Sequence, residues 1–301
     1  MVNNPFQYNV FDRIKGFFLQ KSALSRLMLI NIVVWIVVMF VNVLTWLFAK
    51  NNTSLMLDWF AVPANLATLA HRPWTVFTYM FLQEGFGHLF FNMLVLYFGG
   101  VIFLQFMSQR QLVYTYIVGG LTGALFFILA YNTFPVFEDA VYASVALGSS
   151  ASVLSVLVSA ATIRPNYDVN LLFLGKIKMK WVAIILVVVD FLSINRNNPG
   201  GHIAHLGGAF WGFLYTWLLM KGTDVYIIFK FHSHKYKKRY KSGTFKSPDY
   251  NKRPKTDEQY NRERAEEQMA IDDILDKISK YGYSSLSDSE KEFLFKQSKK
   301  Y

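Results

Sequence analysis

Uncharged segments long enough to cross a lipid bilayer recur along the chain. Five stretches of 23 to 27 residues contain no Asp, Glu, Lys or Arg; they are 27–49, 85–109, 111–137, 140–163 and 197–220. A helix needs about 20 apolar residues to cross the hydrocarbon core. A sixth stretch, 181–194, is shorter and is apolar except for Asp190. Backbone groups find no water in lipid, so all six should be helices. The pattern predicts an all-α, polytopic membrane protein built as a bundle of six transmembrane helices.

Basic residues in the connecting loops predict the orientation. Lys and Arg gather before residue 27, between the fourth and fifth spans, and after residue 220. Because basic loops remain on the cytoplasmic side, we expect both termini there. The first apolar run is long and lacks a small-residue cleavage site, which argues against a cleavable signal peptide. The expected divisions are a cytoplasmic segment at 1–26, a membrane domain at 27–220 and a cytoplasmic tail at 221–301.

The first external connection, 49–84, is unusually long and rich in aromatic residues. It shows no obvious element of its own, and such loops are usually functional or disordered. Trp and Tyr prefer the level of the lipid headgroups. We expect this loop to lie in the outer leaflet, either as part of the functional apparatus or as a plain aromatic anchor.

Composition sharpens this picture through the uneven placement of charge. Hydrophobic residues make up 53% of the chain and charged residues 17%, and the net charge is +11. The last 81 residues carry 32 of the 51 charged side chains. A disordered chain and a uniformly soluble enzyme are therefore excluded. The absence of Cys removes disulfide scaffolds, thiol nucleophiles and thiolate metal sites.

Polar residues inside the predicted spans are candidates for function, because placing them in lipid is costly. The second span carries His88 and Asn92 four residues apart, on one helical face. The fourth contains Ser150, two residues after Gly148, and the sixth contains His205. These three spans run in the same direction, and each places its polar group towards the outer face. Acyl transfer needs a nucleophile, a base and oxyanion donors, and Ser150, His205 and the His88/Asn92 pair supply these.

Other interpretations of these residues remain open at this stage. Small residues at four-residue spacing, such as Gly208 and Gly212, usually mark close helix packing. Here they would let the sixth span approach the helix of Ser150. Asp190 could lie at a helix end near water. Three imidazoles (His88, His202 and His205) could bind a metal, but the spacing of a helical His-Glu-x-x-His site is absent. A transporter would line a whole path with polar groups, whereas these gather near one face.

The motifs together resemble those of the rhomboid intramembrane serine proteases. The matching residues are His88-x-x-x-Asn92, Gly148-x-Ser150, and Ala204-His205-Leu206-Gly207-Gly208 with Gly212. The resemblance covers roughly residues 70–220 and implies a Ser150–His205 dyad without an Asp. It further implies an oxyanion hole of His88, Asn92 and the Ser150 N–H, and no metal or organic cofactor. The implied substrate is a transmembrane helix of another protein, cut near its outer end, with the fifth span as lateral gate.

Two departures from the family pattern bear on the site. Leu154 stands where many members carry an aromatic residue that stacks on the catalytic His. His205 would then depend on backbone packing for its orientation. Gln83 stands where a second His is frequent. A non-proteolytic rhomboid-like substrate-binding protein is the alternative function; such a protein should lack the serine or the histidine, so the presence of both argues against it.

The tail combines a basic stretch with a helical pattern. Residues 230–255 contain ten Lys and Arg and a single acid, which predicts contact with anionic lipid headgroups. Nothing beyond charge supports nucleic-acid binding. Apolar spacing and a Ser287–Glu290 capping box predict a short helical hairpin at 265–298. So small a unit suggests a partner surface, for a protein or a second copy of this chain. The pattern resembles the tail of some bacterial rhomboids, which implies a bacterial inner-membrane location.

Overall fold

The computed structural model describes residues 10–48, 55–171, 175–226, 269–279, 281–282 and 285–298. The chain divides into two compact units, Met1–Ser233 and His234–Tyr301. The basic stretch at 230–255 lies outside the described residues, and so does part of the predicted hairpin at 265–298. Residues 1–9 are also outside them, and side chains are described only from residue 15 onward. The predicted boundaries at 1–26, 27–220 and 221–301 stay predictions.

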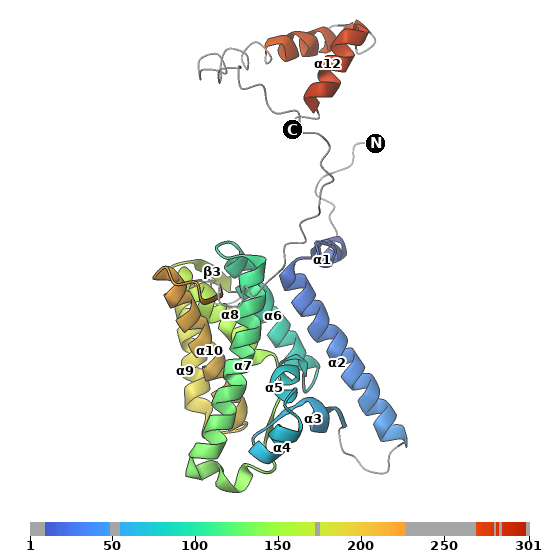
Figure 1. Ribbon diagram of the computed structural model, residues 1–301. Helices are drawn as coiled ribbons and strands as arrows, with labels where there is room; N and C mark the ends of the chain where they lie inside the picture. Colours follow the sequence, from blue (N-terminus) through green and yellow to red (C-terminus); the bar gives the residue numbers. More distant parts are fainter. Residues whose placement is uncertain are drawn as a thin grey trace, which may run out of the picture. The chain divides into compact units, whose positions relative to one another are not determined.

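The first unit is a helical bundle (Figure 1). After α1 (Val10–Leu19), its longer helices are α2 (Ala23–Phe48), α6 (Phe86–Leu104), α7 (Gln109–Thr133), α8 (Ser150–Ile163), α9 (Met179–Ser193) and α10 (Pro199–Met220). Among the described residues, α2, α6, α7 and α10 are long and apolar enough to cross a membrane. Helices α8 and α9 have only 14 and 15 residues. The chain is a multi-pass membrane protein, while the count of six spans stays a prediction.

The fourth helix starts ten residues later than the sequence predicts. The uncharged run 140–163 becomes helical only at Ser150. The residues before it form the 3-10 helix η2 (Pro135–Ala140) and the strand β2 (Val145–Ala146), which pairs antiparallel with β1 (Val62–Pro63). Gly148 interrupts the chain with φ +125°, a value that L side chains rarely adopt. An absence of charge predicts burial in lipid but does not distinguish a helix from an extended segment.

The described part of the long first loop is folded, so the prediction of a connection without elements is wrong. It contains α3 (Leu55–Phe60), α4 (Leu66–His71), α5 (Thr75–Thr78) and the 3-10 helix η1 (Tyr79–Phe81). The Trp59 and Trp74 rings stack at 6.2 Å, and the Trp74 indole N–H donates to the Trp59 carbonyl. The Thr78 hydroxyl donates to the Phe60 carbonyl. These short helices are held by contacts between distant residues, which periodicity cannot reveal.

The loop between α8 and α9 contains a hairpin of β3 (Asp168–Leu171) and β4 (Gly175–Lys178). Its ends are joined by an ion pair of 2.8 Å between Lys178 Nζ and Asp168 Oδ1. The hydrogen bond from Lys178 lowers the pKa of the Asp168 carboxyl. The sequence pattern had indicated only a basic loop at this place.

Helix α8 lies at the centre of the bundle. Every residue from Ala151 to Ala161 is buried, against α6, α7 and α10. Small side chains allow this packing, and the hydroxyls of Ser155 and Ser159 donate to the carbonyls of Thr115 and Gly212. Helix α2, in contrast, exposes large apolar side chains such as Phe40 and Trp46. The bundle therefore shields a small-residue centre and presents an apolar surface outward, as a lipid environment requires.

The second unit contains a helix at 269–279 and α12 (Asp288–Ser298). Gly282 follows the first helix with φ +77°, and its N–H donates to the Ile278 carbonyl. The predicted capping box is present: the Ser287 N–H donates to Glu290 Oε2, and the Glu290 N–H donates to Ser287 Oγ. An ion pair of 2.9 Å between Lys277 and Glu290 joins the two helices.

Candidate active site

The centre of the site is a hydrogen bond between a serine and a histidine from different helices. Ser150 is the first residue of α8, and His205 lies in the second turn of α10. The distance between Ser150 Oγ and His205 Nε2 is 2.6 Å. At the first position of a helix the backbone N–H has no partner within the helix, and the helix dipole favours negative charge there. The pair thus combines a hydroxyl in contact with a base and a backbone environment suited to an anion.

Two glycines bring the helix of His205 against the helix of Ser150. A Cβ added at Gly208 would overlap the carbonyl oxygen of Ala151, and one added at Gly212 would overlap that of Ser155. The two helices therefore touch backbone to backbone along one seam. A larger residue at either position would push α10 away from α8. The length of the Ser150–His205 hydrogen bond depends on this close approach.

Asp190 binds the other side of the histidine. Its Oδ1 lies 2.8 Å from Nδ1 of His205 and 2.8 Å from Nδ1 of His202. The residue is 9% exposed, so the carboxylate is not the wetted helix-end group that the sequence left open. The expectation that His205 relies on backbone packing for its orientation is also wrong. A carboxylate on α9 holds the imidazole, and Nδ1 donates to it while Nε2 faces Ser150.

His88 lies across from the serine, at the start of α6. The backbone N–H of Glu84 donates to His88 Nδ1 at 3.3 Å, so in the neutral ring the proton is on Nε2. A Cβ at Gly148 would lie 2.8 Å from His88 Cε1, 3.2 Å from Nε2 and 3.5 Å from Ser150 Oγ. The His88 donor and the Ser150 hydroxyl therefore border the same small space, which Gly148 leaves open. A developing oxyanion at that place would face an N–H donor.

Asn92 belongs to a buried amide network one turn further along α6. Its Nδ2 donates to Gln83 Oε1 at 2.8 Å, and Gln83 Nε2 donates to Ser149 Oγ at 2.8 Å. Gln83 is 2% exposed and lies within 3.3 Å of the Asn31 side chain as well. Sequence reasoning noted Gln83 only as a departure from the family pattern. In the structure it connects Asn92 to the residue that precedes Ser150, a contact that no sequence spacing could indicate.

One group of side chains in the described part of the chain could hold a metal ion. The ligand atoms of Asp190, His202 and His205 lie within 4.8 Å of one another. Carboxylate and imidazole ligands suit Zn²⁺. This group differs from the three imidazoles that the sequence suggested, because His88 is not part of it. The two contacts between Asp190 and the histidines have the length of hydrogen bonds. The expectation that no metal takes part in the function stays a prediction.

An apolar cavity of about 620 Å³ separates α6 from α9. Leu94 and Phe98 line it from α6, and Val182 and Leu186 line it from α9. Asp190 follows these residues on α9, and His88 precedes the others on α6. Val169 and Asn170 of β3 also line the cavity, so it lies in the half of the bundle next to the β3–β4 hairpin, and the catalytic candidates lie beyond it towards the other end.

Comparison with known proteins identifies the family. Residues 70–222 match the Rhomboid domain, and residues 255–300 match a family of unknown function, DUF6576. The chain is 28% identical over 171 residues to the RHOMBOID-like protein 12, mitochondrial, of Arabidopsis thaliana. That match covers 54% of this chain and 48% of the relative, so the chain spans about half the length of that protein. The Rhomboid match includes His88, Asn92, Ser150, Asp190 and His205 and extends over half of the chain. The protein belongs to the rhomboid family.

Proposed function

We propose that the protein is an intramembrane serine endopeptidase that cleaves transmembrane helices of other membrane proteins. The observation that carries the proposal is the 2.6 Å hydrogen bond between Ser150 Oγ and His205 Nε2. A serine hydroxyl is a weak nucleophile until a base accepts its proton, and this geometry provides that base. Within the proposal, Ser150 and His205 are the catalytic residues.

Acylation begins with attack of Ser150 Oγ on the scissile carbonyl carbon. The serine proton passes to His205 Nε2, and the C–O bond forms as the carbonyl π electrons move to oxygen. The resulting tetrahedral intermediate carries one negative charge. His205 then protonates the leaving amine, the C–N bond breaks, and an acyl-enzyme remains on Ser150. Water, deprotonated by His205, attacks the ester and releases the acid and the free serine.

The oxyanion is held by donors that surround the space left by Gly148. His88 Nε2–H and the Ser150 backbone N–H are the two donors that this geometry favours. Asn92 uses one of its amide hydrogens for Gln83 and has a second that is able to support the same anion. Each such donor contributes roughly 10²–10³ in rate in serine proteases.

Asp190 is a positioning residue for His205. By accepting from Nδ1 it keeps the proton on that nitrogen and leaves Nε2 as the acceptor for Ser150. Its negative charge also stabilises the imidazolium that forms during attack. The resemblance at the sequence level implies a dyad without an Asp, and this contact extends that dyad to a third residue. Asp190 comes from α9, so the orientation of the base depends on the position of that helix.

The substrate reaches the site from the bilayer. We propose that the apolar cavity between α6 and α9 receives the substrate helix, and that α9 is the lateral gate. The site then lies near the outer face, with both termini in the cytoplasm, in a bacterial inner membrane, and the reaction uses no cofactor. The basic stretch at 230–255 would contact anionic lipid, and the tail would bind a protein partner or a second copy of this chain.

A non-proteolytic rhomboid-like protein that only binds membrane helices is the alternative. Such a protein has no need of a serine hydroxyl bonded to an imidazole, which in turn is bonded to a carboxylate. The two functions differ in one measurement, the cleavage of a reporter transmembrane helix by the full chain in liposomes. We expect the wild type to cut and Ser150→Ala to lose cutting. Cleavage by Ser150→Ala at the wild-type rate, or uptake of the reporter without cleavage by the wild type, contradicts the proposal.

A further inference from the structure

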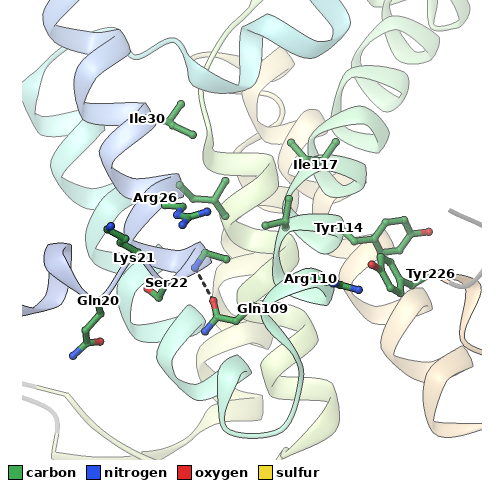
Figure 2. A pocket seen from close by; sticks show the side chains of 13 residues that line it. Gln20, Lys21, Ser22, Arg26, Ile30, Gln109, Arg110, Tyr114, Ile117 and Tyr226 are labelled. Atoms are coloured by element: carbon green, nitrogen blue, oxygen red, sulfur yellow. Dashed lines mark hydrogen bonds between the residues drawn. The ribbon is translucent and has the colours of Figure 1, made fainter. Parts of the chain in front are cut away.

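A pocket of about 1030 Å³ lies at the other end of the bundle from the catalytic candidates (Figure 2). It opens between the first turns of α2 and α7, the helices that begin at Ala23 and Gln109. The Ala23 N–H donates to Gln109 Oε1, and this bond ties the two helix ends together. Ser150, in contrast, begins α8, which runs antiparallel to α7. The pocket is therefore separate from the proposed active site.

One side of the pocket is cationic. Lys21, Arg26 and Arg110 line it, and none of the described residues that line it is acidic. Within the described part of the chain, none of these three side chains pairs with a carboxylate. Asp224 lies two residues before the lining residue Tyr226, but its carboxylate accepts a hydrogen bond from the Tyr226 backbone N–H and does not pair with any of the three cations. The N-terminal ends of α2 and α7 add the positive ends of two helix dipoles. Among the described residues, no carboxylate therefore acts as a counter-ion for the three cations.

The other side of the pocket is apolar and open to the surroundings of the bundle. Leu27, Ile30, Val113 and Ile117 form this wall. Ile30 is 45% exposed and Val113 is 38% exposed, so both face the lipid environment of the helices. Figure 2 shows Ile30 and Ile117 on one side of the pocket, and Lys21, Gln109 and Arg110 on the other. The pocket changes from cationic to apolar along the direction of the bundle.

We propose that this pocket binds one anionic phospholipid from the leaflet at the N-terminal end of α2. The headgroup phosphate contacts Lys21, Arg26 and Arg110, and an acyl chain lies against the apolar wall. Basic pockets between membrane helices are suited to such headgroups. A soluble anion would use only the cationic side and would leave the exposed apolar wall without a role.

The test measures binding of phosphatidylglycerol to the detergent-solubilised full chain by native mass spectrometry, with phosphatidylcholine as the neutral reference. Each basic residue near the headgroups contributes about 1 kcal/mol, which is about a fivefold change in affinity. We therefore expect the triple variant Lys21→Gln, Arg26→Gln, Arg110→Gln to bind phosphatidylglycerol about 100-fold more weakly. The matched control, Arg164→Gln with Lys176→Gln and Lys180→Gln, removes the same charge elsewhere and should retain binding. Equal losses in both triple variants would overturn the proposal.

Location and source of the ligand are tested separately. A phosphatidylglycerol analogue with a diazirine on its acyl chain should label peptides that contain Ile30 or Val113 when the full chain is in liposomes. Labelling confined to other segments contradicts the site. Ile30→Trp with Val113→Trp fills the apolar wall and should weaken phosphatidylglycerol binding at least fivefold. If that variant binds normally, and inorganic phosphate displaces the lipid better than chloride of equal ionic strength, the pocket is a site for free phosphate and the proposal is wrong.

Discussion

Asp190→Asn provides the sharpest test of how the base is held. The amide has the shape of the carboxylate, so the packing of α9 against α10 should persist. It lacks the charge, and it can present N–H in place of oxygen to His205 Nδ1. An imidazole that turns or changes tautomer no longer accepts the Ser150 proton through Nε2. We expect kcat to fall while the affinity for substrate changes little.

The size of the fall follows from the contact that is lost. The bond between Asp190 Oδ1 and His205 Nδ1 is 2.8 Å long, and the carboxylate side chain is 13% exposed. A hydrogen bond to a charged group contributes about 1.5–3 kcal/mol. At about 1.4 kcal/mol for each tenfold change in rate, kcat should fall about 10- to 150-fold. Because the same oxygen also accepts a hydrogen bond from His202, it is shared between two donors, and we expect the fall in kcat to lie in the lower half of this range.

The assay is single-turnover cleavage of a fluorescent transmembrane reporter by the full chain in liposomes, over a range of reporter-to-lipid ratios. His202→Asn is the matched control, because it removes the other donor to Asp190 and leaves the bond to His205. That control should keep kcat within about threefold of the wild type, because substitutions that leave the key contacts in place usually change the free energy by no more than about 0.5 kcal/mol. Thermal unfolding of both variants checks that the bundle is intact.

Two results would refute this reasoning. A stable Asp190→Asn variant with wild-type kcat would show that His205 is oriented without the carboxylate. A loss that appears only as weaker substrate binding would make Asp190 a residue of the substrate path, not a positioning residue for the base.

Three further variants test other parts of the account. Gly208→Ala places a methyl group against the Ala151 carbonyl and should destabilise the bundle by about 1–3 kcal/mol, measured by unfolding in detergent. At Gly87 an added Cβ meets nothing within 4 Å, so the control Gly87→Ala should leave the stability almost unchanged. Gln83→Leu leaves the Asn92 amide and the Ser149 hydroxyl without their partner and should lower the free energy of unfolding by about 1–3 kcal/mol. The control Gln105→Leu, at an exposed site, should lower it by less than about 0.5 kcal/mol, and equal losses of stability in the two variants would contradict the network. Hydrogen bonds from Lys277, and after it from Ser287, lower the pKa of Glu290 from 4.5 to about 2, so the ionised Glu290 carboxylate stabilises the C-terminal unit above pH 4.5 and this stabilisation is lost as the pH falls towards 2. Carbon-13 NMR of the Glu290 carboxyl should show that midpoint, and Lys277→Gln should raise it; a midpoint near 4.5 in the wild type argues against the ion pair.

The sequence could predict much of the candidate site because lipid makes polar residues conspicuous. Ser150, His205 and His88 stand out as polar groups at a similar depth in segments that lack Asp, Glu, Lys and Arg, and the glycines at 208 and 212 lie one turn apart. Runs without charged residues also predict which segments cross the membrane. They cannot predict where a helix starts, since Gly148 and the β1–β2 pair delay α8 without any change in charge.

The contacts of Asp190 could not be predicted for a different reason. It lies on another helix, 12 residues before His202 and 15 before His205. Its meeting with both depends on how α9 packs against α10, a tertiary property that no spacing encodes. Gln83 is a similar case, because its partners come from α6, from the start of α8 and from α2. The folded first loop likewise depends on Trp59 meeting Trp74 across 15 residues.

The central claim is that His205 activates Ser150, and covalent labelling tests it most directly. The full chain in liposomes is treated with a fluorophosphonate, and the modified residue is located by peptide mass mapping. The account predicts modification of Ser150, none in Ser150→Ala, and labelling slowed at least about 100-fold in His205→Ala, as expected when a general base is lost. Ser152→Ala removes a buried hydroxyl that has no hydrogen-bond partner among the described residues and should label at the wild-type rate. Modification of another residue, or labelling that does not depend on His205, would contradict the claim.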